Sequence, residues 1–525
     1  MKNIFTYFAL GFGLFVGNVL FTSCEDKLDE SAENQVTSSD IDYTQSQNMI
    51  QPILGLYAKT YAIGWEVLPC LNVRGDDVNH GGEGDQQAFA DIDNYIYDNN
   101  FWMINSAWEA QYRNIITSYA TKDQLEAYKE AGADAAKADQ YMGESDVIKA
   151  WYLLSLVRNF NKILIPKASD PSLMLKQSLV SQTEGYQYIV DEMERVKDQL
   201  PAVRPGERTD IPGGVTKYTA LAIEMLANLE LNNWDAAAKN AGDIIGSNKF
   251  ELMSDYYQLF KTPGKLCKEN IFELQYSDFG TGSGDNKSHL WAFYGPQGWT
   301  PKIDGAGSGW GFWEPSEKYI KFMLDRGEKT RLETTVLFTN RGIADLETDA
   351  KYATLPSWIS NTTPSGDVIN DYARALFASG KHYLPSDQLI SGRTGYGSNK
   401  NFTMIRYAEV LLSYAEAVVN GGAIQNGMTA VDAVNIVRTR AGLSPLTSVT
   451  LDDVLNEKYA ELACEQGQRF WDLLRYKKYN ELSYDGRTFT VDKEFLPYPL
   501  KQIDSLPVLA KEVAAEKASS LDSAQ

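Results

Sequence analysis

Histidine and cysteine are both scarce in this sequence, and their scarcity excludes several kinds of site. The 525 residues contain 3 histidines and 4 cysteines. The histidines, His80, His289 and His382, share no spacing that fits a transition-metal site. The cysteines form no CxxC pair and lie far apart, so neither a zinc site nor a disulfide framework is indicated. We therefore expect no metal and no cofactor.

The signatures of common enzyme classes are also missing. The sequence contains no HExxH, no GxSxG, no GxxxxGK(S/T), and no GxGxxG after a strand pattern. A glycine-rich stretch at 280–286 lacks the lysine of a phosphate loop. A glycosidase needs only two suitably placed carboxylates, and 70 acidic residues leave that alternative open. We expect a protein without catalytic residues, with a glycoside hydrolase as the alternative.

Positive charge is in deficit. The chain has 49 Lys and Arg against 70 Asp and Glu, which gives a formal net charge of -21 at pH 7. Such a surface repels phosphate backbones, and no basic stripe reverses this locally, so we expect no nucleic-acid partner. A hydrophobic content of 43% indicates a folded chain, because disordered proteins bury too little apolar surface.

Residues 1–23 have the layout of a secretory signal peptide. Lys2 precedes an apolar run from Ile4 to Phe21, and small residues follow that run. The run alone would also fit a single membrane span. The residues LFTSC that end at Cys24 resemble a bacterial lipobox, in which this cysteine becomes the lipidated first residue of the mature protein. We expect 24–48, which is acidic and polar, to be a lipidated flexible tether.

Helical periodicity dominates residues 49–263. Apolar residues recur at helical spacing in six segments, 49–64, 102–130, 142–160, 183–200, 216–231 and 233–247. Alanines in the last two segments let paired helices approach closely, as in helix–turn–helix solenoids. The spacing between pairs is irregular, so a strict repeat is not demonstrable. We expect a tetratricopeptide-like helical scaffold.

Residues 264–400 have a different character. A strand-like stretch is followed by sequence rich in Gly, Trp and Ser, with few long segments of hydrophobic periodicity. Long irregular inserts in compact proteins are commonly functional. We predict an irregular ligand-binding insertion here, carried by a fold that is otherwise mainly α.

Helical patterns return in 401–525. They predict helices over 401–420, 428–441 and 450–478, and prolines predict an extended segment over 495–509. Thr450 and Asp453 form a plausible capping box for the third helix. The first helix carries an apolar stripe from Met404 to Val419, and its flanking residues are also apolar. We expect it to be a core helix whose polar residues, Arg406, Glu409, Ser413 and Glu416, lie opposite the stripe.

Tryptophans gather in one glycine-rich stretch, 289–313. It contains Trp291, Trp299, Trp310 and Trp313, together with Tyr294. Aromatic rings on loops offer flat faces for the C–H face of a sugar, and each stack contributes ~0.5–1.5 kcal/mol by analogy with other aromatic pairs. We predict that these side chains bind glycan. The alternative is that some of them only hold the loop against the helices.

A second loop, 71–94, supplies polar groups. We predict that Arg74, Asp76, Asp77 and Asn79 bond sugar hydroxyls. The loop does not fit the EF-hand template, because no Asp start has Gly at its sixth and Glu at its twelfth position. A surface loop with its own turn bonding is the alternative.

Four segments resemble the SusD/RagB family, the cell-surface glycan-binding lipoproteins of Bacteroidetes. They are GESDVIKAWYLLSLVRNFNKILIP (143–166), MIRYAEVLLSYAEAVVNGG (404–422), ELACEQGQRFWDLLRYKK (461–478) and FLPYPLKQID (495–504). With the lipobox they span nearly the whole chain in the family's order. The resemblance implies a tetratricopeptide-like scaffold that carries an irregular, non-catalytic ligand-binding subdomain.

The resemblance also implies partners. Such a protein sits on an outer-membrane SusC-like TonB-dependent transporter, is held at the cell surface by its lipid, and hands oligo- or polysaccharide to the transporter. The family's binding residues vary between members, so the site above is placed by physical argument alone. A plant glucan would suit a flat tryptophan platform. A lipid-anchored glycoside hydrolase, and an adaptor whose aromatic loop contacts only the transporter, stay as alternatives.

Overall fold

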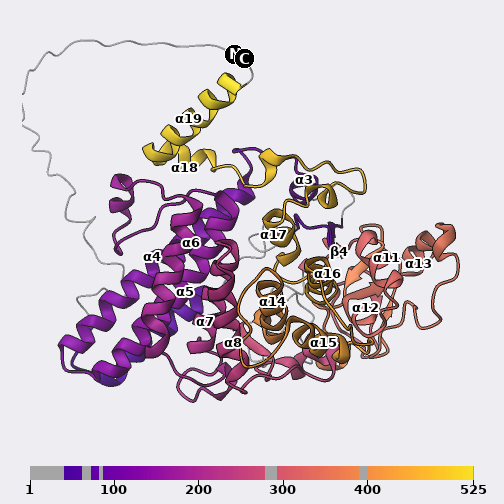
Figure 1. Ribbon diagram of the computed structural model, residues 1–525, viewed down its shortest axis with the longest axis horizontal. Coiled ribbons are helices and arrows are strands. Elements are labelled where there is room, and N and C mark those ends of the chain that lie inside the picture. The colour runs from indigo at the N-terminus through magenta and orange to yellow at the C-terminus, as the bar shows by residue number, and fades with distance from the viewer. Residues whose placement is uncertain (1–40, 62–72, 82–86, 278–292, 390–398, 524–525) are drawn as a thin grey trace, which may run out of the picture.

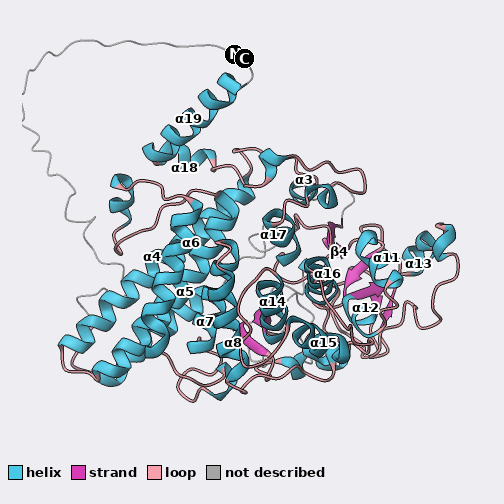
Figure 2. Ribbon diagram, in the orientation of Figure 1, coloured by secondary structure: helices cyan, strands magenta, loops and turns pink. Residues whose placement is uncertain are grey.

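The computed structural model describes residues 41–61, 73–81, 87–277, 293–389 and 399–523. Helices dominate these residues, and the strands among them form four two-stranded antiparallel sheets (Figure 2). The predicted mainly α fold is confirmed. Cys24 and Trp291 lie outside the described residues.

The first helical part is a series of helices packed side by side (Figure 1). Its members are α1 (Gln51–Tyr61), α4 (Trp102–Glu130), α5 (Ala135–Phe160), α6 (Gln182–Val196), α7 (Lys217–Glu230) and α8 (Trp234–Gly246). From α4 to α8 each helix packs against the next in the chain. Buried alanines, among them Ala222 and Ala227 on α7, allow this close approach. All six predicted helices are present, although α5 begins ahead of the predicted start because Asp134 caps it by accepting the Lys137 N–H.

The helix predicted over 401–420 is in part a strand. Phe402–Arg406 forms β8, and only Tyr407–Val419 forms the helix, α14. Strand β8 pairs antiparallel with β2 (Asn270–Leu274), and this long-range ladder overrides the local helical pattern. Both ends of the 264–400 segment are thereby joined in one ribbon directly before α14.

Helix α14 is a core helix, as predicted. It packs against α7, α8, α15 (Ala430–Arg440) and α16 (Leu451–Leu462). The apolar stripe is buried, and so are the polar residues Glu409, Ser413 and Glu416. The polar face therefore meets other protein groups and not solvent.

The helix predicted over 450–478 is two helices, α16 and α17 (Gln468–Arg475). The predicted capping box is confirmed, because Thr450 and Asp453 bond each other's backbone N–H groups. The chain breaks between the helices, where Cys464 and Gly467 have positive φ angles of 62° and 72°.

The extended segment predicted over 495–509 is also partly wrong. It contains α18 (Leu500–Ser505) and the start of α19 (Pro507–Ser523). Pro499 precedes the first residue of α18, and Pro507 is the first residue of α19. Proline is tolerated at these positions because an N–H at the start of a helix makes no hydrogen bond within the helix.

The irregular part gathers short elements at one end of the molecule, around α11–α13 (Figure 1). Its helices are α9 (Tyr256–Leu259), just before it in sequence, α11 (Glu317–Asp325), α12 (Thr330–Thr335) and α13 (Asn340–Leu346). Its strand pairs are β3 (Trp299–Thr300) with β6 (Val368–Ile369), and β5 (Val336–Phe338) with β7 (Phe377–Ser379). Strand β4 (Trp313–Pro315) pairs with β1 (Val78–His80), which precedes α3 (Gln87–Asp93).

Candidate functional site: an aromatic hairpin and its buried support

The tryptophan-rich stretch folds back on itself as a hairpin. The N–H groups of Gly309 and Gly311 donate to the carbonyl oxygens of Pro296 and Gly295, both at 2.9 Å. These bonds hold the two sides of the stretch together. Residues 302–305, between the two sides, are exposed, while the N–H groups of Lys302 and Ile303 donate to the side chains of Asp367 and Ser386.

Glycine is required at the neck of the hairpin. A Cβ atom on Gly309 would lie 2.4 Å from the backbone carbon and oxygen of Gly295, far inside van der Waals contact. A Cβ on Gly81 would lie 2.2 Å from the carbonyl oxygen of Gly311. Since the obstacles are backbone atoms, a side chain at Gly309 would push the two sides of the hairpin apart, and one at Gly81 would push the residue after β1 away from the hairpin.

Trp299 lies half-buried on the first side of the hairpin. It pairs with Ile369 across β3 and β6, and its ring meets Tyr383 edge to face at 6.1 Å between centroids. Asn370, directly after β6, donates from its side chain to the Thr300 hydroxyl at 3.0 Å. Both of these polar residues are exposed. This strand pair therefore carries a half-buried indole together with an exposed amide and an exposed hydroxyl.

Trp310 lies half-buried on the returning side. Its ring packs at 5.5 Å on Phe312, which stacks on Phe89 of α3. The Arg374 guanidinium covers the Phe312 ring at 4.3 Å. Trp310 thus rests on a firm aromatic base while part of its ring stays accessible.

Two of the predicted glycan-binding aromatic residues are core residues, which corrects the prediction for them. Tyr294 and Trp313 are buried, with ring centroids 4.3 Å apart, and both pack against the buried His382. The tyrosine hydroxyl and the indole N–H have no hydrogen-bond partner among the described residues. Neither ring has a face open to a sugar, because both side chains point into the core.

Arg74 and Asp76 are buried as well, so the polar contacts predicted for them are wrong in this structure. Arg74 donates to the Asn159 side chain at 2.6 Å and lies over the Phe470 ring. Asp76 pairs with Arg469 and Lys318, each at 2.8 Å. Burial alone would raise the pKa of Asp76, but these two cations hold it below its ordinary value.

Asp77 is buried, and Asn79 is half-buried beside it. One Asp77 carboxylate oxygen accepts the Cys464 N–H at 2.7 Å, while the other has no partner among the described residues. Burial raises the pKa of Asp77 to about 6. Asn79 accepts from Tyr484 and Arg487. The 73–79 segment is therefore a structural clamp between α16, α17 and the irregular part.

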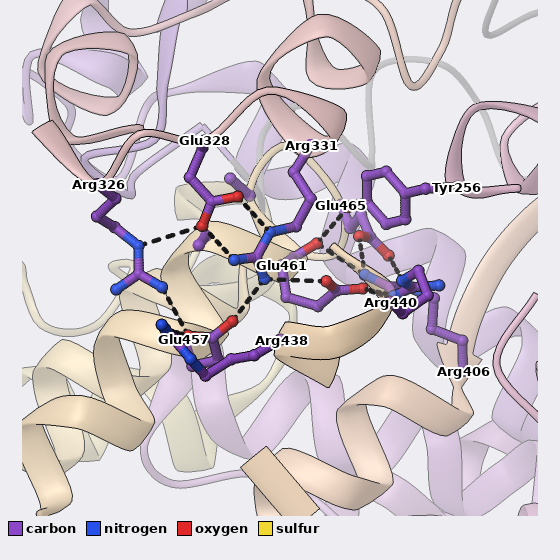
Figure 3. Close-up of polar contacts among 12 residues, drawn as sticks. Tyr256, Arg326, Glu328, Arg331, Arg406, Arg438, Arg440, Glu457, Glu461 and Glu465 are labelled. Carbon is purple, nitrogen blue, oxygen red and sulfur yellow. Dashed lines mark hydrogen bonds and ion pairs between the residues drawn. The ribbon is translucent and has the colours of Figure 1, made fainter. Parts of the chain in front are cut away.

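Sequence reasoning missed a buried ion-pair network, which Figure 3 shows. Glu461 on α16 accepts from Arg331 of α12, Arg406 of β8 and Arg440 of α15. Arg406 also pairs with Glu465 at 2.7 Å. Burial alone would raise the pKa of Glu461, but the three arginines hold it far below its ordinary value. The network ties the irregular part to the C-terminal helices.

A signal for this network is present in the sequence. Glu457, Glu461 and Glu465 recur every four residues. Like charges on one helix face repel unless cations are held against them. When such a helix lies inside the protein, its glutamate face therefore predicts arginine partners. Hydrophobic periodicity alone would place this glutamate face in solvent.

Carboxyls with raised pKa values lie in the interior. Burial raises the pKa of Glu273 on β2 and of Glu409 on α14 to about 7. A glycosidase needs such an acid beside the bound sugar. These two sit among core elements instead, so packing accounts for their shifts.

No cluster of three or more His, Cys, Asp or Glu side chains suited to a metal ion occurs among the described residues. Within the same residues, no helix is both long and apolar enough to cross a bilayer.

Comparisons with known proteins give one consistent result. The family model described as the SusD family matches residues 268–509. The SusD-like protein P2 of Formosa agariphila is 26% identical over 445 residues, which cover 78% of this chain and 79% of the relative. A SusD-like protein of Bacteroides ovatus is 19% identical over 389 residues, covering 72% and 66%.

Solved structures share the fold. Surface glycan-binding protein A from Bacteroides thetaiotaomicron, in complex with laminarihexaose, has a TM-score of 0.69 at 22% identity and covers 87% of this chain and 97% of its own. A laminarin-binding SusD-like protein has a TM-score of 0.71 at 22% identity, covering 88% and 97%.

Proposed function

The chain belongs to the SusD family, and we propose that it is a cell-surface protein that captures oligo- or polysaccharide and delivers it to a SusC-like TonB-dependent outer-membrane transporter. Members of this family bind carbohydrate and are not catalytic. In this proposal Cys24 carries the lipid anchor, and residues 24–48 are the tether.

The observation that carries the proposal is the aromatic hairpin. Trp299 and Trp310 are both half-buried on a segment whose residues 302–305 are exposed. Half-burial suits a stacking platform, because the protein fixes the ring while part of its surface stays available for a sugar. Thr300 and Asn370, which are exposed in the strand pair that carries Trp299, offer donors and acceptors for hydroxyl groups.

The ligand class follows from these groups. Indole faces, an amide and a hydroxyl match an uncharged sugar, whereas an acidic polysaccharide would meet a chain with a net charge of -21. Two structures with this fold are described as binding laminarin or laminarihexaose. We therefore place neutral glucans first among the glycans to be tested.

Affinity electrophoresis against a polysaccharide panel tests the proposal. The panel contains laminarin, other neutral plant glucans, xylan, and acidic pectin. We expect retention by at least one neutral polymer, and weaker retention of Trp299→Ala and Trp310→Ala. Trp102→Ala is the matched control, because Trp102 is 51% exposed but lies on α4, outside the hairpin.

Each alternative predicts a different result. If both hairpin variants bind every retained polymer as the parent does, the platform is misplaced. Release of reducing ends by the purified protein would support a hydrolase. Co-purification with a transporter and retention by no polysaccharide would support an adaptor. Loss of surface location in Cys24→Ala tests the anchor.

A further inference from the structure

A cleft lies in the irregular part, where α9 meets α12. It has a volume of about 600 Å³. Its lining comes from α9 and the residues before it, from α12, and from Pro364. Tyr257 is half-buried in this wall, and Asp255 and Gln258 flank it.

The cleft continues into a smaller notch. Glu333 and Pro364 line both hollows, so the two share a wall. The notch has room for about one water molecule, with a volume of about 20 Å³. Trp358 and Asn361 also line the notch. We call the two adjoining hollows the groove; its lining includes Tyr257, Glu333 and Trp358.

This groove reaches the Trp299 platform. Ile369 lines the notch, and it is the cross-strand partner of Trp299. Directly paired residues on neighbouring strands hold their side chains side by side. In addition, Tyr257 and Trp299 pack against the same small core cluster, which contains Ile369 and Tyr383. The groove therefore begins one side chain away from the hairpin platform.

The lining has the chemistry of a site for neutral sugars. It combines four aromatic side chains, of which Tyr257 and Trp358 are half-buried and Tyr256 and Phe338 are buried, with several hydroxyl and amide groups. Neither hollow is lined by Lys, Arg or His, and the two carboxylates, Asp255 and Glu333, make the groove negative. Sulfated or uronic acid ligands would meet like charge without a counter-charge. An uncharged sugar finds ring faces to stack on and acceptors for its hydroxyl protons.

Glu333 stands out within this lining. It is half-buried, and its carboxylate has neither a hydrogen bond nor an ion pair to any described residue. Nearby acidic residues of the same region, such as Glu328 and Asp367, are paired. A carboxylate that faces a hollow without a protein partner is available to accept hydrogen bonds from a ligand.

Hydrogen bonds within the protein hold the walls of the groove. The Tyr257 hydroxyl bonds the Ser365 hydroxyl at 3.0 Å, and Lys261 lies under the ring. Asp367 accepts from both the N–H and the hydroxyl of Ser386, which pins the turn that carries Pro364. Pre-organised walls lower the ordering cost of binding.

We propose that this groove is an extension of the glycan site that binds further units of a neutral chain whose first units stack on the Trp299 platform. The inference rests on the proposed function and adds to it a dependence on chain length. A disaccharide would occupy the platform alone. A hexasaccharide would also contact Trp358 and Glu333.

The test compares chain lengths in calorimetric titrations. The probes are the di-, tetra- and hexasaccharides of the laminari-, cello- and malto- series. In a series that binds the parent, we expect Trp358→Ala and Glu333→Gln each to weaken hexasaccharide binding roughly three- to tenfold, with disaccharide binding unchanged. Glu347→Gln is the matched control, because Glu347 is exposed in the same region and lines neither hollow.

The outcomes separate this inference from the proposed function. Hexasaccharide binding at the parental level in both groove variants overturns the extension and leaves the function intact. Equal losses for disaccharide and hexasaccharide also overturn it, since they indicate a general structural effect. If no series and no panel polymer binds the parent, the proposed function fails and the extension fails with it. Thermal unfolding of Glu333→Gln, the milder change, verifies that folding is retained.

Discussion

Two adjacent aspartates provide a sharp test of the buried clamp. Asp77→Asn should stabilise the protein at alkaline pH. The pKa of Asp77 is raised from 3.8 to about 6 by burial, with a smaller contribution from Asp76. The folded state therefore favours the protonated form, and stability is lost as the pH rises from about 4 through about 6. A shift of about two pKa units corresponds to ~3 kcal/mol as an upper bound.

Asparagine removes this penalty and keeps the contact. Its amide oxygen can accept the Cys464 N–H that now bonds Asp77 at 2.7 Å. We expect Asp77→Asn to gain about 1–3 kcal/mol at pH 8, and the gain to vanish near pH 4. Asp76→Asn is the matched opposite. It leaves the buried Arg469 without its carboxylate partner and should cost about 3–5 kcal/mol at pH 8.

Urea unfolding of the parent and both variants at pH 4, 6 and 8 measures these differences. Glycan retention is measured on the same samples at pH 8 and should not change for Asp77→Asn. If Asp77→Asn instead loses glycan binding at pH 8 while keeping its stability, this carboxylate touches ligand. The clamp interpretation would then be refuted in favour of a sugar-binding loop.

Two further predictions concern the support of the hairpin. Glu461→Gln leaves Arg331, Arg406 and Arg440 with less negative charge and should lower the unfolding free energy by about 3–5 kcal/mol at pH 7. Because the pKa of Glu461 is depressed in the folded state, its contribution to stability is present above about pH 4.5 and fades on acidification. If the variant has the same unfolding free energy as the parent at pH 7, the network does not stabilise the fold. Gly309→Ala should cost about 1–3 kcal/mol and weaken glycan retention, since its Cβ meets the Gly295 backbone; unchanged melting and retention would show that the neck is not tight.

Local patterns predicted much of the helical fold. The helix over 102–130 and the capping box at Thr450 follow from periodicity and from side-chain bonding to adjacent backbone, which sequence displays directly. Strand β8 could not be found in this way. Its residues continue an apolar helical stripe, and only the distant strand β2 makes the extended form favourable.

The site was harder to predict, because sequence does not reveal which way a loop side chain turns. Trp299 and Trp313 lie in similar glycine-rich sequence, yet Trp299 is half-buried at the hairpin and Trp313 is buried in the core. Asp76 was interpreted as a ligand for hydroxyl groups because it lies in a polar loop. Its actual partner, Arg469, is almost four hundred residues away in the chain, a pairing that only the folded structure reveals.

The central claim is that half-buried indoles on the hairpin hold a neutral glycan. Calorimetric titration of the Trp299→Ala/Trp310→Ala double variant with a polysaccharide that the parent retains tests it most directly. Two stacking contacts at ~0.5–1.5 kcal/mol each predict binding about five- to 150-fold weaker than that of the parent, in a double variant that is still folded. A dissociation constant equal to the parent's, measured on a folded double variant, would contradict the account.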